Sequence, residues 1–292
     1  MSTLRILHLT DTHLFGDDSR HYGVVDTADH LRRALAHVGD RTFDIVVCSG
    51  DVSEDGTEAS YVWAHDIIAT WAAERGARAI FAMGNHDKRA SFRAVLGDGQ
   101  PGVRTSPLVS GPERARPVSS VASVAGWRTI VLDTSVPLAG YGALETAQLD
   151  ALAEVLAQPA EHGTVIVMHH PPARAETDLL QALALDEESA AGLWARIRGT
   201  DVKAVLCGHY HHAIFETVFG IPVLVAPGVT NLAAAFDGPE EESAADWFGG
   251  AVVEISDGRV RALPFTEPVT GAEVFRFSTA EVAQIIDAAG RP

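Results

Sequence analysis

The chain has 292 residues, 47% of them apolar and 21% charged, which is the composition of a globular protein with ample material for a core. Its formal net charge of −17 argues against nucleic acids and anionic membranes as partners, because Lys and Arg dominate binding to both. No apolar run approaches the ~20 residues that span a bilayer, and the N-terminus lacks the pattern of a secretory signal. Cys48 and Cys207 each lie in an apolar run, so we expect buried thiols in a cytoplasmic protein.

Short apolar runs alternate with helical patterns through the first two thirds of the chain. The predicted strands are Arg5–Leu9, Asp44–Cys48, Arg78–Met83, Thr129–Leu132, Thr164–Met168 and Val202–Cys207. The predicted helices are Thr27–Val38, Thr57–Glu74, Thr146–Leu156 and Glu188–Ile197. Because most of these strands are continuously apolar, we expect them to be covered on both faces. The alternation predicts a layered α/β architecture.

The pattern changes after residue 208, where closely spaced strands replace the alternation. These strands are Ala213–Val218, Pro222–Ala226, Gly250–Ile255 and Arg259–Phe265. We interpret Gly97–Pro117 and the acidic stretch Asp237–Asp246 as loops. Near the C-terminus, Ser278 and Glu281 form a capping-box pattern that begins a short helix. This helix either docks on its own domain or contacts a second subunit.

Residues that can bind metals follow five of the six early apolar runs. They are Asp11 and His13 after the first run, Asp51 after the second, Asn85 and His86 after the third, His169 and His170 after the fifth, and His209 and His211 after the sixth. Ligands of open α/β sheets gather at the carboxyl ends of strands, so these side chains can meet at one point. Each motif alone is compatible with a structural turn or a solvated loop, but their joint occurrence in this order favours a site.

The residue types predict a centre with two metal ions. Carboxylate, amide oxygen and imidazole suit Fe, Mn or Zn, and two ions that share one carboxylate need about seven ligands. Asp11, His13, Asp51, Asn85, His169, His209 and His211 supply that number. Of the other histidines, we expect His30, His37, His65 and His162 to be surface groups, whereas the His21-Tyr22 pair can reach the rim of the site. Tyr210 is either packed or at the lip of the site.

These motifs resemble the blocks D-x-H, G-D, G-N-H-[DE], H and G-H-x-H of the calcineurin-like metallophosphoesterase superfamily, over residues 4 to 265. The resemblance implies a four-layer α/β/β/α sandwich of two mixed β-sheets flanked by helices. It implies a catalytic domain at 1–265, a tail with a short helix at 266–292, and a possible homodimer. It also implies that Asp51 bridges two ions: one is held with Asp11, His13 and His211, and the other with Asn85, His169 and His209.

The resemblance also implies a role for His86, which would contact the phosphate and aid the leaving group. Asn85, His86 and His211 would bind the substrate. Two bound cations lower the pKa of a shared water, which would then attack phosphorus in line with the departing ester oxygen. We expect His170, and less directly Asp133, to support the ligands from behind by hydrogen bonding.

Within the superfamily, the segments Leu7–Leu14, Gly84–Asp87, Leu132–Pro137 and Met168–Pro172 look like those of bacterial class III cyclic nucleotide phosphodiesterases. The expected reaction is hydrolysis of a 3′,5′-cyclic nucleotide, such as cAMP, to the 5′-nucleotide. Glycerophosphodiester phosphodiesterases share much of this signature, so that activity and a broad-specificity phosphoesterase are the alternatives. A scaffold that kept the fold without catalysis is disfavoured, because such proteins usually lose ligands.

Overall fold

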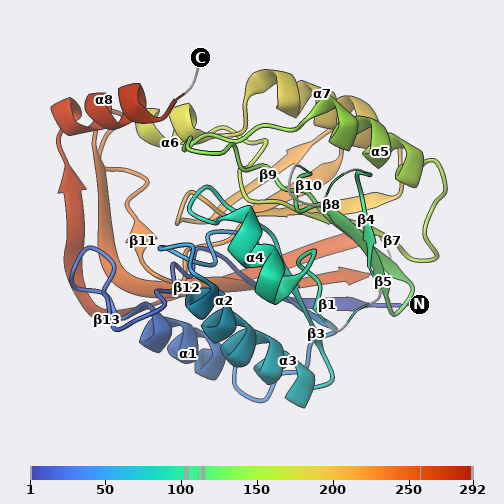
Figure 1. Ribbon diagram of the computed structural model, residues 1–292, viewed down its shortest axis with the longest axis horizontal. Coiled ribbons are helices and arrows are strands. Elements are labelled where there is room, and N and C mark those ends of the chain that lie inside the picture. The colour runs from blue at the N-terminus through green and yellow to red at the C-terminus, as the bar shows by residue number, and fades with distance from the viewer. Residues whose placement is uncertain are drawn as a thin grey trace.

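A computed structural model describes residues 2–290 of the chain, except 102, 104, 111, 113–115 and 257. Two β-sheets pack face to face, and helices cover the outer face of each sheet (Figure 1). Both sheets contain parallel and antiparallel pairs. The structure therefore confirms the α/β/β/α sandwich with two mixed sheets.

The first sheet has six strands among the described residues, in the order β11-β12-β1-β2-β3 with β13 paired to β12. Their bounds are β1 Leu4–Leu9, β2 Ile45–Cys48, β3 Arg78–Phe81, β11 Leu232–Ala233, β12 Glu242–Ser256 and β13 Arg259–Phe277. β1, β2 and β3 are parallel, so their carboxyl ends lie at one edge of the sheet.

The second sheet has seven strands within the same described ranges, in the order β4-β5-β6-β7-β8-β10-β9. Their bounds are β4 Ser106–Pro107, β5 Ser120–Val124, β6 Trp127–Val131, β7 Gly163–Val167, β8 Val202–Cys207, β9 Ile214–Val218 and β10 Ile221–Val225. β6, β7, β8 and β10 are parallel, which gives this sheet its own common carboxyl edge.

Helices on the first sheet precede those on the second in the chain. The first group is α1 Thr27–His37, α2 Glu58–Ala64, η1 His65–Ala69, α3 Thr70–Glu74 and α4 Arg89–Leu96. The second is α5 Thr146–Leu156, α6 Asp178–Leu183 and α7 Glu187–Ile197, and α8 spans Thr279–Ala288. The predicted Thr57–Glu74 helix is thus one helical run interrupted by a π-helical segment. The capping box of Ser278 and Glu281 is confirmed.

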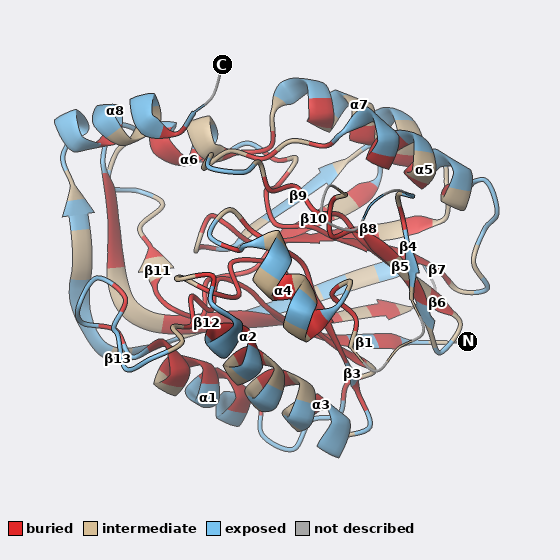
Figure 2. Cartoon of the chain, in the orientation of Figure 1, coloured by how far each residue is buried: buried red, intermediate tan, exposed pale blue. Residues whose placement is uncertain are grey.

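Apolar side chains fill three layers of core. Along β1, Leu4 and Ile6 pack between the two sheets, while Leu7 and Leu9 face the helices, as the period of two in a strand requires. Both sheets are buried over most of their central strands (Figure 2). Cys48 and Cys207 are buried free thiols on the helix-facing sides, as predicted. No helix in the described part of the chain combines the length and apolarity needed to cross a lipid bilayer.

The C-terminal hairpin is longer than the sequence predicts. β13 continues past Phe265 to Phe277, so residues 266–277 belong to the first sheet and the helical tail begins at Ser278. The stretch predicted as an acidic loop is also half strand, because β12 begins at Glu242. The sequence pattern marks neither segment as a strand. The end of β13 is largely exposed, and the start of β12 carries the polar residues Glu242, Ser243 and Asp246. α8 lies against α6 of its own chain.

One histidine prediction is wrong. His30 of α1 is 2% exposed, and its Nε2 lies 3.0 Å from Asp246 Oδ1. Its Nδ1 lies 3.3 Å from the carbonyl oxygen of Val229. The helical pattern alone did not reveal that β12 would supply a buried carboxylate opposite α1.

The core between the sheets should dominate stability. Leu206 is fully buried there, so Leu206→Ala should lower the free energy of unfolding by about 2–5 kcal/mol, through lost burial and a residual cavity. The control Leu263→Ala removes a half-exposed side chain on β13 and should change the free energy of unfolding by less than about 0.5 kcal/mol. Urea unfolding of the metal-free protein measures both; equal effects would contradict the dry inter-sheet core.

Candidate metal centre

The predicted ligands lie where the carboxyl edges of the two sheets meet. Asp11 and His13 follow β1, Asp51 follows β2 and Asn85 follows β3, all in the first sheet. The second sheet supplies His169 after β7, and His209 and His211 after β8. Residues 200 positions apart in the chain are therefore brought into contact, as the sequence predicts.

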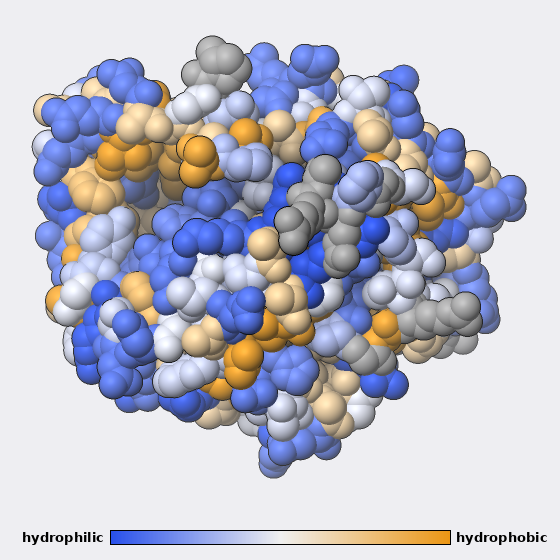
Figure 3. Space-filling model, in the orientation of Figure 1, coloured by the Kyte–Doolittle hydropathy of each residue, from blue (hydrophilic) through white to orange (hydrophobic). Residues whose placement is uncertain are grey.

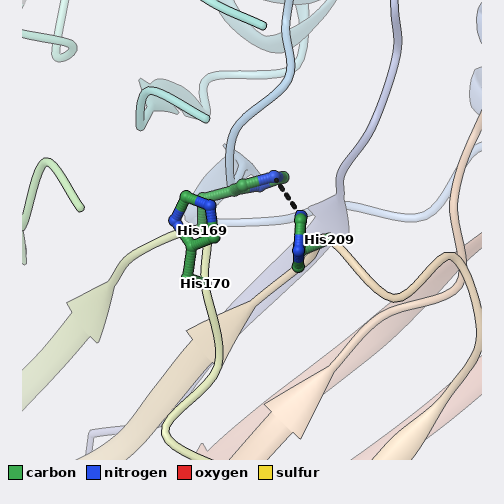
Figure 4. Close-up of side chains that lie close together, drawn as sticks. All are labelled: His169, His170 and His209. Atoms are coloured by element: carbon green, nitrogen blue, oxygen red, sulfur yellow. Dashed lines mark hydrogen bonds between the residues drawn. The ribbon is translucent and has the colours of Figure 1, made fainter. Parts of the chain in front are cut away.

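Two pairs of imidazoles point their nitrogens at each other. His13 Nε2 and His211 Nε2 are 3.3 Å apart, and His169 Nε2 and His209 Nδ1 are 3.2 Å apart. Figure 4 shows the second pair, whose members come from different loops of the second sheet. Two nitrogens bound at ~2.0–2.1 Å to one tetrahedral ion lie about 3.3 Å apart. Each pair therefore has the spacing of two ligands to a single ion.

The two aspartates lie between these pairs. Asp51 Oδ2 is 3.2 Å from His169 Nε2 and 3.7 Å from His13 Nε2, so it contacts one member of each pair. Asp11 Oδ1 is 3.3 Å from His211 Nε2 and 3.8 Å from His169 Nε2. Both aspartates thus lie between the two imidazole pairs, the position expected of a carboxylate that is shared by two ions.

Asn85 supplies the clearest sign of a missing partner. Its Oδ1 atom is buried and has no hydrogen-bond partner among the described residues. Buried polar oxygens are normally satisfied, so an unpartnered amide oxygen in a site that Asp51 also lines fits a cation ligand. The donor set as a whole, with anionic oxygens, an amide oxygen and imidazoles, fits a pair of transition-metal ions.

The backbone at the site is held in an uncommon conformation. Five of the seven predicted ligands have positive φ: Asp11 (53°), His13 (43°), Asp51 (45°), His209 (75°) and His211 (53°). Non-glycine residues rarely adopt this region, and such strain persists only where the surrounding structure imposes it. The rigid sheets thus direct these side chains inward at a local conformational cost.

Glycines beside the ligands permit this close approach. A Cβ on Gly84 would lie 2.1 Å from Asp51 Oδ1, and one on Gly208 would lie 2.8 Å from Asp11 Oδ2. A Cβ on Gly50 would lie 2.4 Å from His169 Nδ1. The glycines of the G-D, G-N-H-D and G-H-x-H blocks are therefore needed for space at the centre itself.

The electrostatics keep both carboxylates anionic. Burial opposes their ionisation, but neighbouring imidazolium charges outweigh it and hold the pKa values of Asp11 and Asp51 below their usual range. Burial also opposes the charged form of His169, yet Asp51 and Asp11 raise its pKa to about 9. For His209, burial and nearby His169 lower the pKa to about 3. The site thus concentrates negative charge between basic nitrogens.

His86 stands at the exposed edge of the centre. Its backbone N–H donates to Asp51 Oδ1 (2.9 Å), and its Nδ1 lies 3.1 Å from Glu54 Oε2. Despite burial, the charges of Asp51 and Glu54 raise the pKa of His86 to about 10. Its imidazole is therefore suited to donate a hydrogen bond to an anion.

Two supporting residues were missed by sequence reasoning. Glu54 Oε2 is 2.6 Å from His13 Nδ1 as well as near His86, so one carboxylate orients both rings. Asn231 Oδ1 lies 2.8 Å from His211 Nδ1. Glu54 could have been suspected, because it is an acidic residue only three positions after Asp51. Asn231 follows β10 and lies in no recognisable motif.

The two predicted supporting residues have different environments. His170 has both nitrogens engaged, with Thr134 Oγ1 (2.8 Å) and the Gly140 carbonyl oxygen (3.3 Å), and its ring packs beside His169 and His209 (Figure 4). Asp133 instead accepts from Arg89, Val118 and Ser135. His170 is therefore placed to support the ligands by packing, whereas Asp133 organises the loop after β6.

A cleft of about 250 Å³ opens over the metal centre. Its lining residues include His13, Asp51, Asn85, His86 and His211 on the polar side, and Leu179, Leu183, Phe275, Phe277 and Ile285 on the apolar side. Figure 3 shows apolar side chains gathered beside a hollow below α8. Tyr22 and His21 also line the cleft, as predicted for the rim. Tyr210 is packed, fully buried with its hydroxyl donating to the Ala173 carbonyl oxygen.

Glu242 adds a polar group to the cleft wall. It accepts a hydrogen bond of 2.6 Å from Thr177 Oγ1 and is 3% exposed. Burial raises the pKa of Glu242 to about 7. Partial desolvation, with nearby Glu54 and Glu242, also raises the pKa of Tyr22 to about 12, so its phenol remains neutral. Glu242 was not singled out from the sequence, whereas Tyr22 was expected at the rim.

The chain matches the family model for calcineurin-like phosphoesterases over residues 4–213. It belongs to the calcineurin-like phosphoesterase family. The crystal structure of a dimetal phosphatase from Danio rerio has the same fold, with a TM-score of 0.59 and 16% identity over 90% of this chain and 98% of the other. The matched family segment contains all seven predicted ligands.

Bacterial relatives of this calcineurin-like phosphoesterase are more similar in sequence. A Mycobacterium tuberculosis (strain CDC 1551 / Oshkosh) protein named cAMP/cGMP dual specificity phosphodiesterase MT0825 is 39% identical over 223 residues. The match covers 76% of this chain and 66% of that protein, so the chain spans just under two thirds of its length. A Vibrio vulnificus (strain CMCP6) protein named 3′,5′-cyclic adenosine monophosphate phosphodiesterase CpdA is 30% identical, over 77% of this chain and 76% of that protein.

The close approach at Gly84 makes a sharp test of the centre. Gly84→Ala should displace Asp51, because the new methyl group overlaps its Oδ1 and its backbone nitrogen. We expect most bound metal to be lost while the fold is retained, as read by elemental analysis and circular dichroism after reconstitution with Mn²⁺ or Zn²⁺. In the control Gly192→Ala on α7, the one close contact of the methyl group is with the flexible end of the Leu149 side chain on α5. Normal metal content in Gly84→Ala would refute the central role of Asp51.

Proposed function

We propose that this chain is a two-metal phosphodiesterase that hydrolyses 3′,5′-cyclic nucleotides to 5′-nucleotides. The observation that carries the proposal is the pair of imidazole pairs joined by Asp51, directly beneath a cleft edged by His86. Metal ions bound there would lower the pKa of water and offset charge on the phosphoryl oxygens. The remaining chemistry falls to the protein's own side chains.

The distances support a definite division of ligands. Asp11, His13, Asp51 and His211 would hold one ion, in keeping with the 3.3 Å approach of the two histidines. Asp51, Asn85, His169 and His209 would hold the other, in keeping with the second imidazole pair and the unpartnered amide oxygen. His170 has both nitrogens occupied and would not be a ligand.

Three residues of the centre face the cleft and would contact the substrate. Asn85, His86 and His211 all line it. His86 would donate from its protonated ring to a phosphoryl oxygen and then to the departing ribose 3′-oxygen, since Glu54 holds its other nitrogen. The acidic net charge does not oppose an anionic substrate, because bound cations dominate the local field.

The choice of a cyclic nucleotide rests on two kinds of support. Relatives up to 39% identical are named cyclic nucleotide phosphodiesterases. The cleft combines a polar floor with an apolar wall, which suits a substrate that joins a phosphodiester to a flat apolar group. A glycerophosphodiester presents no planar ring to the aromatic side chains on this wall. The kind of metal, a homodimer, a cytoplasmic location and the lack of nucleic-acid partners stay predictions of the sequence.

A substrate panel tests this proposal. Metal-reconstituted protein is assayed with cAMP, cGMP, glycerophosphocholine and bis-p-nitrophenyl phosphate, with product analysis distinguishing 5′- from 3′-nucleotides. We expect kcat/KM for a cyclic nucleotide to exceed that for glycerophosphocholine, with the 5′-nucleotide as product. Faster turnover of glycerophosphocholine would favour the glycerophosphodiesterase alternative, and no turnover by metal-loaded protein would favour a scaffold.

Removing the His86 ring should separate metal binding from turnover. His86→Ala deletes a hydrogen-bond donor beside the centre but none of the seven proposed ligands. We expect metal content to be retained and kcat to fall about 10²- to 10⁴-fold, the usual contribution of general acid catalysis. His65→Ala, on the exposed η1 segment, is the matched control and should behave as wild type. Loss of both ions in His86→Ala would contradict this assignment.

A further inference from the structure

Aromatic rings form a continuous row that leads outward from the metal centre. The His13 and His21 ring centroids are 4.9 Å apart, and those of His21 and Tyr22 are 4.6 Å apart. Tyr22 is followed by Phe275 at 4.6 Å and then by Phe277, which stacks on Phe275 at 4.7 Å. We refer to Tyr22, Phe275 and Phe277 as the aromatic shelf. All three line the cleft.

The shelf is built mainly from the end of the long hairpin. Phe275 and Phe277 are two residues apart on β13 and so share one face of the strand. Arg276 lies between them and instead pairs with Asp237 and Glu273. In Figure 1 this part of β13 rises along the edge of the molecule to α8. The segment lies beyond residue 213, where the family match ends.

Aliphatic side chains supply the other apolar surface of the cleft. Leu179, Leu180 and Leu183 come from α6, and Ile285 comes from α8, which packs against α6. Tyr22 remains 51% exposed although its ring is the member of the shelf nearest the metal centre. A large ring left in water on the wall of a cleft is available to stack with a ligand.

We propose that the aromatic shelf is a nucleobase subsite, in which the base of a bound nucleotide stacks on Tyr22 and Phe275 while its phosphate lies at the metal centre. This inference rests on the proposed function for the position of the phosphate. The shelf offers ring faces, which suit a planar heteroaromatic group, and its rings are already spaced as stacked pairs. At about 250 Å³ the cleft has room for a small ligand at the metal centre.

Calorimetry with paired ligands tests the subsite without relying on catalysis. The metal-loaded full chain is titrated with 5′-AMP and with ribose 5-phosphate, which share a phosphorylated sugar and differ by the base. The ratio of their Kd values therefore reports the base alone. We expect 5′-AMP to bind about tenfold more tightly than ribose 5-phosphate, the order expected for one base–aromatic stack.

Variants at Phe275 locate the effect. Phe275→Leu keeps an apolar side chain and should keep the fold, but it removes one of the two ring faces, so the ratio should fall toward one. Phe275→Ala should lower the ratio in the same way. Phe275→Trp keeps an aromatic face, so its ratio should equal or exceed that of wild type. Phe219→Ala removes an exposed phenylalanine on the turn between β9 and β10, outside the cleft, and should leave the ratio unchanged.

The outcomes separate this inference from the proposed function. Equal binding of the two ligands by wild type, or an unchanged ratio in Phe275→Leu, would overturn the subsite even if cAMP is hydrolysed. A base preference that depends on Phe275 would uphold the subsite even if cAMP is not turned over. Tighter binding of glycerophosphocholine than of 5′-AMP by wild type, lost in Phe275→Leu, would assign the shelf to a different ligand. That result would also overturn the inference.

Discussion

The charge of two buried aspartates, Asp11 and Asp51, is the interaction on which the functional end of the molecule depends. Unpaired carboxylates in a dry interior are strongly unfavourable, so groups that compensate them must be close. Imidazoles from both sheets approach these carboxylates within 3.2–4.0 Å. Because the compensation comes from His13 on one sheet and His169 on the other, the centre holds its geometry only while the two sheets stay packed. The apolar layer between the sheets is therefore part of the site.

That layer also explains how strained backbone is tolerated. The predicted ligands with positive φ would relax to more favourable backbone conformations if their loops were free to move. Each loop is instead short and tied at both ends: Asp11 N donates to the Gly50 carbonyl oxygen, and His13 N donates to that of Asp51. Asp87 accepts from the backbone of Val52, Ser53 and Gly84, which joins the second and third motifs. The loops thus support one another before any ion is bound.

The sequence revealed the centre better than its surroundings, for a physical reason. Metal ligands must be of a few residue types, and several candidates lie at strand ends directly after a glycine, so Asp51, Asn85 and His209 could be proposed from pattern alone. The layered fold followed equally from continuous apolar runs. Glu54 and Asn231 act through ordinary hydrogen bonds that many residue types can make, and only spatial contact identifies them. The end of β13 was missed because Pro268 and Gly271 interrupt a largely exposed strand whose alternation is confined to its last residues. His30 was missed because its carboxylate partner is distant in sequence.

The hairpin of β12 and β13 has a consequence for how such a protein can diverge. Its base is anchored in the first sheet beside β1, while its far end and α8 stand over the cleft. Register shifts near Ala245 already set that far end apart from the regular ladder below it. Insertions, deletions or exchanged side chains there would reshape the mouth of the cleft without disturbing the loops that carry the ligands. The proposed chemistry and the proposed base recognition would thus lie on parts of the chain that can change separately, which would give evolution a route to new substrates at a fixed reaction centre.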